Sequence, residues 1–153
     1  MLAYIALGAN LGDARATVLQ ALQDLQTLPQ TRLQRRSSLY RSAPVEAAGP
    51  DFINAVAEVA TALSPQQLLT ELQLLEQTAG RQRPYRNAPR TLDLDILLYG
   101  DLQLDSPVLT IPHPRLGARA FVLLPLAEIA PSRVTAVQLQ AVAQQGIERL
   151  TDN

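Results

Sequence analysis

Two aspartates, Asp93 and Asp95, alternate with apolar residues in the segment TLDLDILLYG, a pattern typical of a strand. Alternate residues of a strand share a face, so both carboxylates are expected to point the same way, with Cα atoms about 7 Å apart. Folding alone gains nothing from such a pair, because like charges repel and strands disfavour aspartate. A hard cation explains it, since Mg²⁺ binds carboxylate oxygens while keeping waters and substrate phosphates in its shell. The opposite face is predicted to point to the core and comprises Leu92, Leu94, Ile96 and Leu98.

Four arginines lie within ten residues immediately before this strand: Arg81, Arg83, Arg86 and Arg90. A guanidinium group pairs well with phosphate oxygens, and arginines together with a metal ion can neutralise a polyphosphate. The alternative is a solvated, charge-rich loop that neutralises a pair of surface carboxylates. The chain has neither a lysine nor a glycine-rich phosphate loop. A nucleotide would therefore be held by side chains and metal.

The elements that position these residues follow from hydrophobic periodicity. In chain order we expect a strand at 2–7, a helix at 13–28, strands at 32–41 and 52–63, a helix at 65–79 and the aspartate strand at 91–99. This order favours an α+β domain with a ferredoxin-like core, in which helices pack on a mostly antiparallel sheet. No repeat or linker divides the chain, so we expect one domain, 1–153.

The pattern is less regular after the aspartate strand. A hairpin-like turn at Gly100 is expected to lead into LQLDSPVL, and IPHP at 111–114 to form a rigid extended loop. Pro125 interrupts an apolar run, which leaves its conformation open, and a last helix is expected over 135–145. His113 is the only histidine, so a histidine-rich metal site is excluded. A hydrogen-bonded loop residue and a donor to phosphate both remain possible roles for it.

Composition narrows the class of protein. Hydrophobic residues make up 47% of the 153 residues, which is ordinary for a globular domain, and the absence of cysteine excludes disulfides and thiolate metal sites. The net charge of -1 argues against a surface built for nucleic acid or for an anionic membrane. The first residues lack the features of a signal peptide, and no stretch is apolar enough to span a bilayer, so the cytoplasm is the expected location.

A co-linear set of motifs resembles the 6-hydroxymethyl-7,8-dihydropterin pyrophosphokinases of folate synthesis. The most specific is RNAPRTLDLDIL, and AYIALGANLGD, DFINA and IPHP occur in the same order as in that family. The resemblance runs from the start of the chain to about residue 131. It implies that ATP donates its β,γ-diphosphate to the hydroxymethyl group of the pterin, leaving AMP. It also implies two Mg²⁺ ions bridged by Asp93 and Asp95, and we expect a monomer.

The resemblance also implies roles for individual residues. Arg81, Arg90, Asp93 and Asp95 would be catalytic. The expected ATP contacts are Gln73, Glu76, Arg83, Ile96, Leu109, Thr110, His113 and Arg119. The expected pterin contacts are Ser42, Ala43, Val45, Phe52, Asn54 and Phe121. Phe52 and Phe121 are the only phenylalanines in the chain and would stack on the flat ring, although either could be ordinary core.

Two other classes of protein compete with this interpretation. A noncatalytic RNA-binding module would show a basic sheet face with stacking aromatics, whereas aromatics are 4% here and the candidate strand carries two aspartates. A metal-dependent phosphodiesterase or nuclease would also use paired aspartates, but it usually needs more carboxylate or histidine ligands than this chain groups together. Release of AMP from MgATP and the reduced pterin alcohol separates the three.

Overall fold

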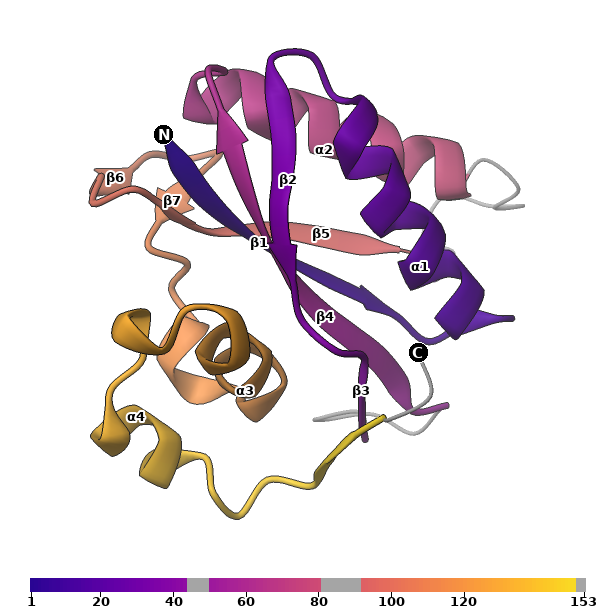
Figure 1. Ribbon diagram of the computed structural model, residues 1–153, viewed down its shortest axis with the longest axis vertical. Coiled ribbons are helices and arrows are strands. Elements are labelled where there is room, and N and C mark those ends of the chain that lie inside the picture. Colours follow the sequence, from indigo (N-terminus) through magenta and orange to yellow (C-terminus); the bar gives the residue numbers. More distant parts are fainter. Residues whose placement is uncertain (44–49, 81–91, 151–153) are drawn as a thin grey trace.

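The computed structural model describes residues 1–43, 50–80 and 92–150. Its core is an antiparallel sheet with helices on both faces (Figure 1). The strand order is β5-β1-β4-β3-β8, and β2 also pairs with β4. The strands of this sheet are β1 (Leu2–Ala9), β2 (Thr31–Arg36), β3 (Tyr40–Ser42), β4 (Phe52–Thr61), β5 (Asp93–Tyr99) and β8 (Ile147–Arg149). The expected α+β class and the predicted β-α-β-β-α-β order are confirmed.

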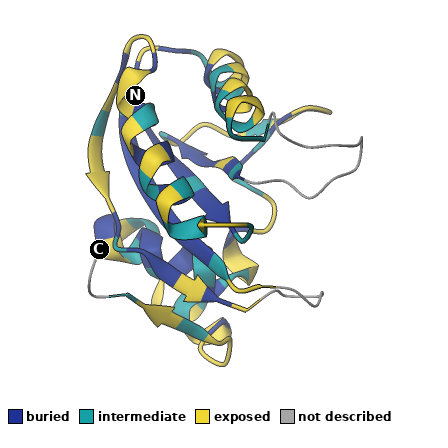
Figure 2. Cartoon of the chain, turned by 90° about the vertical axis from the view of Figure 1, so that its right-hand side faces the viewer, coloured by how far each residue is buried: buried dark blue, intermediate teal, exposed yellow. Residues whose placement is uncertain are grey.

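Alternation along β4 separates the two faces of the sheet, as its sequence predicts. Ile53, Ala55 and Ala57 point to the face covered by α1 (Ala14–Asp24) and α2 (Pro65–Gly80). Val56 points to the opposite face, which is covered by α3 (Ala120–Ile129). Figure 2 shows the result, a sheet whose central strands are mostly buried between exposed outer surfaces.

Both helices of the first face begin at side-chain caps. The Asp13 carboxylate accepts the Ala16 N–H at 3.1 Å at the start of α1. At the start of α2, the Ser64 hydroxyl accepts the Gln67 N–H at 3.1 Å, and the Gln67 side chain accepts the Ser64 N–H at 2.9 Å. Such caps satisfy the free N–H groups of the first turn and fix where each helix begins.

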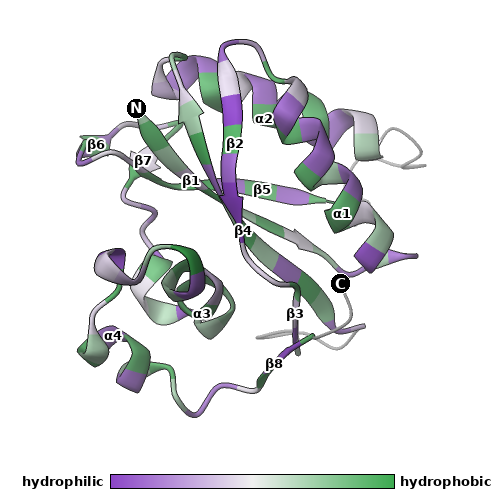
Figure 3. Ribbon diagram, viewed as in Figure 1, coloured by the Kyte–Doolittle hydropathy of each residue, from purple (hydrophilic) through white to green (hydrophobic). Residues whose placement is uncertain are grey.

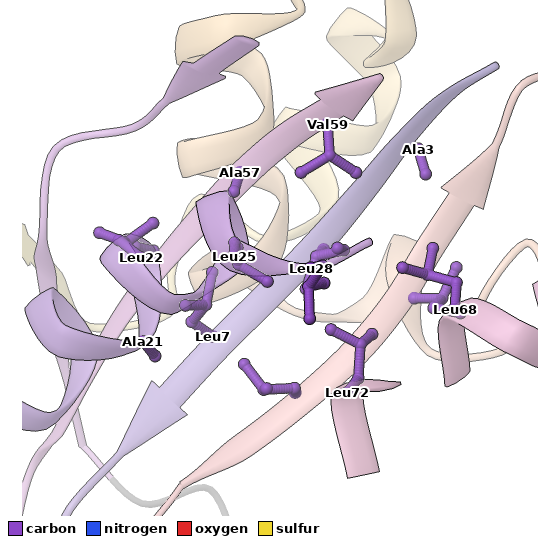
Figure 4. Packing of buried hydrophobic residues seen from close by; sticks show 14 of the residues in the cluster. Ala3, Leu7, Ala21, Leu22, Leu25, Leu28, Ala57, Val59, Leu68 and Leu72 are labelled. Atoms are coloured by element: carbon purple, nitrogen blue, oxygen red, sulfur yellow. The ribbon is translucent and has the colours of Figure 1, made fainter. Parts of the chain in front are cut away.

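Leucines from α1, from the 3₁₀ turn that extends it (Leu25–Thr27) and from α2 converge on the first face of the sheet (Figure 4). Leu22, Leu68 and Leu72 are almost completely buried, and β1 contributes Leu7 beneath them. Each such side chain contributes about 1.5–3 kcal/mol through the apolar area that it removes from water. This packing fixes β1 and β5 under the helices and therefore fixes the backbone that carries the two aspartates.

One side-chain prediction in the aspartate strand is wrong. Leu94 and Ile96 face α1 and α2 as expected, but Leu98 packs with Leu97 on the α3 face. The pairing of β1 with β5 shifts between Tyr4 and Ile5, so that one extra residue is accommodated in β5. Such a bulge interrupts the strict alternation of faces, which is why the simple pattern fails at this point.

The segments after β5 also differ from expectation. Gly100 has a φ of 54° and lies in a turn after β5, but the chain that follows the turn does not pair with β5. Instead, β6 (Leu104–Asp105) pairs with β7 (Thr110–Ile111). The apolar run with Pro125 is helical and forms α3. The last helix is shorter than predicted, because α4 spans only Ala136–Ala141 before the chain turns into β8.

The long edge segment predicted at 32–41 is divided into β2 and β3. Ser37 lies at the break, where its N–H donates to the Val56 carbonyl and its hydroxyl accepts the Val56 N–H, both at 2.9 Å. The side chain thus replaces a ladder hydrogen bond and bends the edge of the sheet. β2 is hydrophilic along much of its length (Figure 3), as suits an exposed edge. None of the helices in the described residues combines the length and apolarity needed to cross a bilayer.

Glu128 near the end of α3 joins that helix to β3 and β8. Its carboxylate accepts hydrogen bonds from the Tyr40 hydroxyl at 2.7 Å and from the Ser38 N–H at 3.0 Å, and it pairs with Arg149 at 3.2 Å. Burial alone would raise the pKa of Glu128, but the bonds from Tyr40 and Ser38 and the charge of Arg149 outweigh it, so the pKa lies below its ordinary value.

We expect Glu128→Gln to lower the free energy of unfolding at pH 7 by about 1 kcal/mol, a modest figure because the ion pair is close to solvent. A lowered carboxyl pKa stabilises the fold above the ordinary value of 4.5 and loses this contribution as the pH falls below it. The acid side of the variant's stability profile, measured by urea unfolding, should therefore be flatter than that of the parent.

Glu148→Gln is the matched control for this prediction. Glu148 pairs with Arg41 at 3.2 Å, but both side chains are largely exposed, at 66% and 49%. Its removal should change the free energy of unfolding by less than about 0.5 kcal/mol. Equal effects of the two substitutions would contradict a specific role for Glu128.

Candidate functional site

A cavity of about 220 Å³ lies on the α3 face of the sheet. Strands β1, β4 and β5 form its floor, and the start of α3 and the chain around His113 form its sides. Its lining brings together eight of the predicted site residues, namely Ala43, Phe52, Asn54, Asp93, Asp95, His113, Arg119 and Phe121. Residues that are up to 78 positions apart in the sequence, from Ala43 to Phe121, therefore surround one space.

The two aspartates occupy one face of β5, as their spacing predicts. Asp93 is partly buried and Asp95 is exposed, and both line the cavity. Leu94 between them is buried in the core under α2. In residues 1–43, 50–80 and 92–150, no cluster of three or more Asp, Glu, His or Cys side chains could hold a metal ion. Two carboxylates on the wall of a cavity fit Mg²⁺, which takes its remaining ligands from water and substrate phosphate.

The outer edge of β5 is held at two points around the aspartates. The Leu94 N–H donates to the Glu76 carboxylate of α2 at 2.8 Å. The His113 N–H donates to the Leu97 carbonyl at 3.0 Å. These bonds satisfy backbone groups on the outer edge of β5 and fix the strand between Asp93 and the loop that carries His113.

His113 is arranged as a neutral hydrogen-bond donor. Its Nδ1 accepts the Arg115 N–H at 3.1 Å, which requires an unprotonated nitrogen, so the proton resides on Nε2. Burial lowers the pKa of His113, and the charges of Arg119 and Arg115 lower it further, while Asp95 opposes them. A neutral imidazole can therefore present an N–H group near the aspartates at neutral pH.

The first turn of α3 supplies an aromatic ring and a positive charge. The Arg119 guanidinium carbon lies 5.3 Å from the centre of the Phe121 ring, within the range of a cation–π contact. Phe121 is only partly buried, so the ring retains surface toward the cavity. A flat aromatic ligand could stack there while Arg119 faces an anionic group of the same or a second ligand.

The strand β4 side of the cavity carries the buried amide of Asn54. Only 4% of this residue is exposed, and its Oδ1 accepts a 2.6 Å hydrogen bond from the Ser42 hydroxyl. Phe52 is two residues away on the same face of β4 and is partly buried. One polar group beside aromatic surface is the usual composition of a site that orients a small heterocycle.

Other predicted site residues lie away from the cavity lining. Gln73 and Glu76 belong to α2, and Thr110 belongs to β7. Ile96 and Leu109 are buried in the core on the first face of the sheet. Their part in ATP binding stays a prediction. Val45 and the arginines of the charge-rich segment lie outside the described residues: Arg81, Arg83, Arg86 and Arg90.

Gly8 is a cavity residue that the sequence did not identify as functional. It is paired with Asn54 of β4 on one side and with Asp93 of β5 on the other. A Cβ atom at this position would lie only 3.2 Å from Asn54 Nδ2 and 4.0 Å from the Phe52 ring. The first strand was expected to end at residue 7, whereas the structure extends β1 through Ala9 and gives Gly8 a place on the cavity floor.

Comparison with known proteins agrees with this arrangement. A family model described as 7,8-dihydro-6-hydroxymethylpterin-pyrophosphokinase matches residues 4–131. The chain is 47% identical over 154 residues to the 2-amino-4-hydroxy-6-hydroxymethyldihydropteridine pyrophosphokinase of Pseudomonas aeruginosa, covering 96% of this chain and 95% of that protein. It is also 47% identical over 133 residues to the Haemophilus influenzae protein of the same name, covering 86% and 83%.

A solved structure supports the fold independently. The chain is similar to the HPPK-DHPS of Plasmodium falciparum with a TM-score of 0.62 and 15% identity, covering 85% of this chain and 40% of that one. At this level of identity the likeness concerns the fold alone. It agrees with the α+β architecture expected from the order of the elements.

The neutral state of His113 can be measured directly, because the chain has no other histidine. An NMR titration of its ring signals should give a pKa below the ordinary value of 6.5. Asp95→Asn should lower this pKa further, because it removes a nearby negative charge that favours the protonated ring. Arg119→Ala should raise it. Shifts of the opposite sign in these two variants would contradict the described surroundings of His113.

Proposed function

This chain belongs to the 7,8-dihydro-6-hydroxymethylpterin-pyrophosphokinase family, and on this premise we propose that the cavity beside α3 is its active site. The enzyme transfers the β,γ-diphosphate of ATP to the hydroxymethyl group of 6-hydroxymethyl-7,8-dihydropterin and releases AMP, a step of folate biosynthesis. The observation that carries the assignment is the shared cavity, in which a pair of carboxylates faces an aromatic and amide-bearing wall.

The pterin occupies the side of the cavity formed by Asn54, Phe52 and Phe121. Its flat ring matches the aromatic surface, and its donors and acceptors match a buried amide. Ser42 and Ala43 lie beside this wall at the end of β3. Enclosure by these side chains removes water from the ring and orients the hydroxymethyl group toward β5.

ATP occupies the side formed by Asp93, Asp95, His113 and Arg119. Two Mg²⁺ ions held by the aspartates would neutralise the phosphates and stabilise the charge that develops on them. Arg119 adds a positive charge at the start of α3, and the neutral His113 ring can donate a hydrogen bond from its Nε2–H group to a phosphate oxygen. Together these residues would position the β-phosphorus for attack by the pterin oxygen, with AMP as the leaving group.

The transfer itself forms one P–O bond and breaks another. The hydroxymethyl oxygen attacks the β-phosphorus, the bond from that phosphorus to the bridging α,β-oxygen breaks, and the hydroxyl proton is released to solvent. The protein's task is mainly positioning and charge stabilisation, as is usual for phosphoryl transfer. We also propose that residues 1–153 form one domain. The monomeric state and the cytoplasmic location expected from the sequence stay predictions.

Loss of either aspartate should abolish turnover without loss of the fold. Asp93→Asn and Asp95→Asn each remove one charge from a side chain that lines the cavity and belongs to neither hydrophobic cluster, so the melting temperature should stay within a few degrees of the parent. Release of AMP under saturating MgATP and pterin should fall at least about a hundredfold. Retention of more than about a tenth of the parental rate by either variant would exclude it as a metal ligand.

Asn54→Ala should weaken pterin binding much more than ATP binding. Loss of a hydrogen bond to a desolvated amide costs about 1–3 kcal/mol, or up to about a hundredfold in Kd. Phe121→Ala should act in the same direction through lost stacking. Calorimetry with a nonhydrolysable ATP analogue measures the two affinities separately, and equal losses for both substrates would count against the proposed pterin wall.

A further inference from the structure

The hydrogen bond between Ser42 and Asn54 joins two buried polar side chains, of which Asn54 lines the cavity. Asn54 is 4% exposed and Ser42 is 6% exposed. The Ser42 Oγ lies 2.6 Å from Asn54 Oδ1, which is short for a bond between neutral groups. The two residues lie on neighbouring strands, where β3 and β4 pair Ser42 with Phe52 and Tyr40 with Asn54. The bond therefore crosses the ladder diagonally on the cavity side.

The hydrogen-bond inventory determines which way the amide faces. An amide oxygen only accepts, so the Ser42 hydroxyl donates its proton to Oδ1. The reversed amide would place Nδ2 against Oγ and would leave the Ser42 proton in need of another acceptor. Asn54 is the only partner recorded for this hydroxyl among the described residues. Because a buried hydroxyl without an acceptor costs free energy, the observed orientation is the favoured one.

The other end of the amide lies beside Gly8, which also lines the cavity. The Nδ2 atom lies toward Gly8, where a Cβ atom would come within 3.2 Å of it, so the missing side chain leaves it room. No hydrogen-bond acceptor for Nδ2 is recorded in the part of the chain that the structure describes. Both Gly8 and Asn54 line the cavity. The N–H donors of Asn54 are thus directed at the space that a ligand occupies.

We propose that Ser42 is a positioning residue that sets the orientation of the Asn54 amide, so that its N–H donors face a hydrogen-bond acceptor on the heterocycle of the substrate. The inference rests on the proposed location of the pterin. Ser42 needs no contact with the ring through its own hydroxyl, because that hydroxyl is already used by Oδ1. Without it, the amide could adopt either orientation, and only part of the population would present the donors correctly.

A purely structural role for Ser42 makes a different prediction. β3 is held to β4 by the backbone ladder, which does not depend on the Ser42 side chain. If the hydroxyl only stabilised this ladder, Ser42→Ala would lower the melting temperature and would affect both substrates alike. If the hydroxyl orients the amide, Ser42→Ala weakens binding of the pterin alone. Threonine at this position then keeps the parental affinity, because it keeps the hydroxyl.

The test compares Ser42→Ala, Ser42→Thr and Asn54→Ala by calorimetry with 6-hydroxymethyl-7,8-dihydropterin in the presence of Mg²⁺ and a nonhydrolysable ATP analogue. Ser42→Ala should raise the Kd of the pterin about fivefold, which corresponds to about one fifth of the amides remaining in the active orientation. Affinity for the ATP analogue should stay within about twofold of the parent. Ser42→Thr should keep the parental pterin Kd, and thermal melts of all three variants report on folding.

The possible outcomes distinguish a failure of the positioning role of Ser42 from a failure of the proposed pterin site. If Asn54→Ala weakens the pterin but Ser42→Ala leaves it unchanged, the positioning role is wrong and the proposed site stands. If neither substitution changes the pterin Kd, the proposed site is wrong and the inference falls with it. If Ser42→Ala loses affinity for both ligands equally, the hydroxyl serves the fold instead. The same conclusion follows if Ser42→Thr does not bind the pterin as the parent does.

Discussion

The register of the central strand β1 is the constraint on which the site depends. Gly8 is the cross-strand partner of Asn54 on β4 and of Asp93 on β5, so one residue without a side chain separates the two halves of the cavity floor. Neighbouring strands lie about 4.8 Å apart, which places the amide and the carboxylate on strands about 10 Å from each other. A slip of one residue in either pairing would move a required side chain to the opposite face. The leucines of α1 and α2 oppose such a slip, because they fit only one register of apolar residues on the first face.

Much of the fold could be predicted from local sequence patterns. The strand expected at 52–63 and the helix expected at 65–79 each follow from neighbouring residues alone, and the structure contains β4 and a helix that begins at the Ser64 cap. The bulge that turns Leu98 toward α3, the pairing of β6 with β7 and the short strand β8 depend on partners distant in the sequence. The same holds for the contacts of Glu128, since no local pattern indicates that a helix carboxylate meets Tyr40 and Arg149.

In the candidate site, too, some residues could be identified from local spacing, whereas others are revealed only by contacts between strands. Asp93 and Asp95 were identified from spacing, because the cost of placing two like charges on a strand calls for an explanation, and the cavity does bring them together with Asn54, His113 and Phe121. The role of Gly8 could not be inferred, since its significance lies in the space that it leaves beside another strand. The hydrogen bond from Ser42 to Asn54 likewise joins residues 12 positions apart, and only the pairing of β3 with β4 reveals it.

The most direct test is a crystal structure with Mg²⁺, a nonhydrolysable ATP analogue and the pterin. We predict that the pterin ring lies between Phe52 and Phe121 with an edge on the Asn54 amide, and that metal ions bound to Asp93 and Asp95 contact the phosphates. A second hollow lies between α1 and α2 and is lined by residues such as Thr17 and Leu75. Either substrate bound there, or metal ions bound away from both aspartates, would contradict the proposed active site.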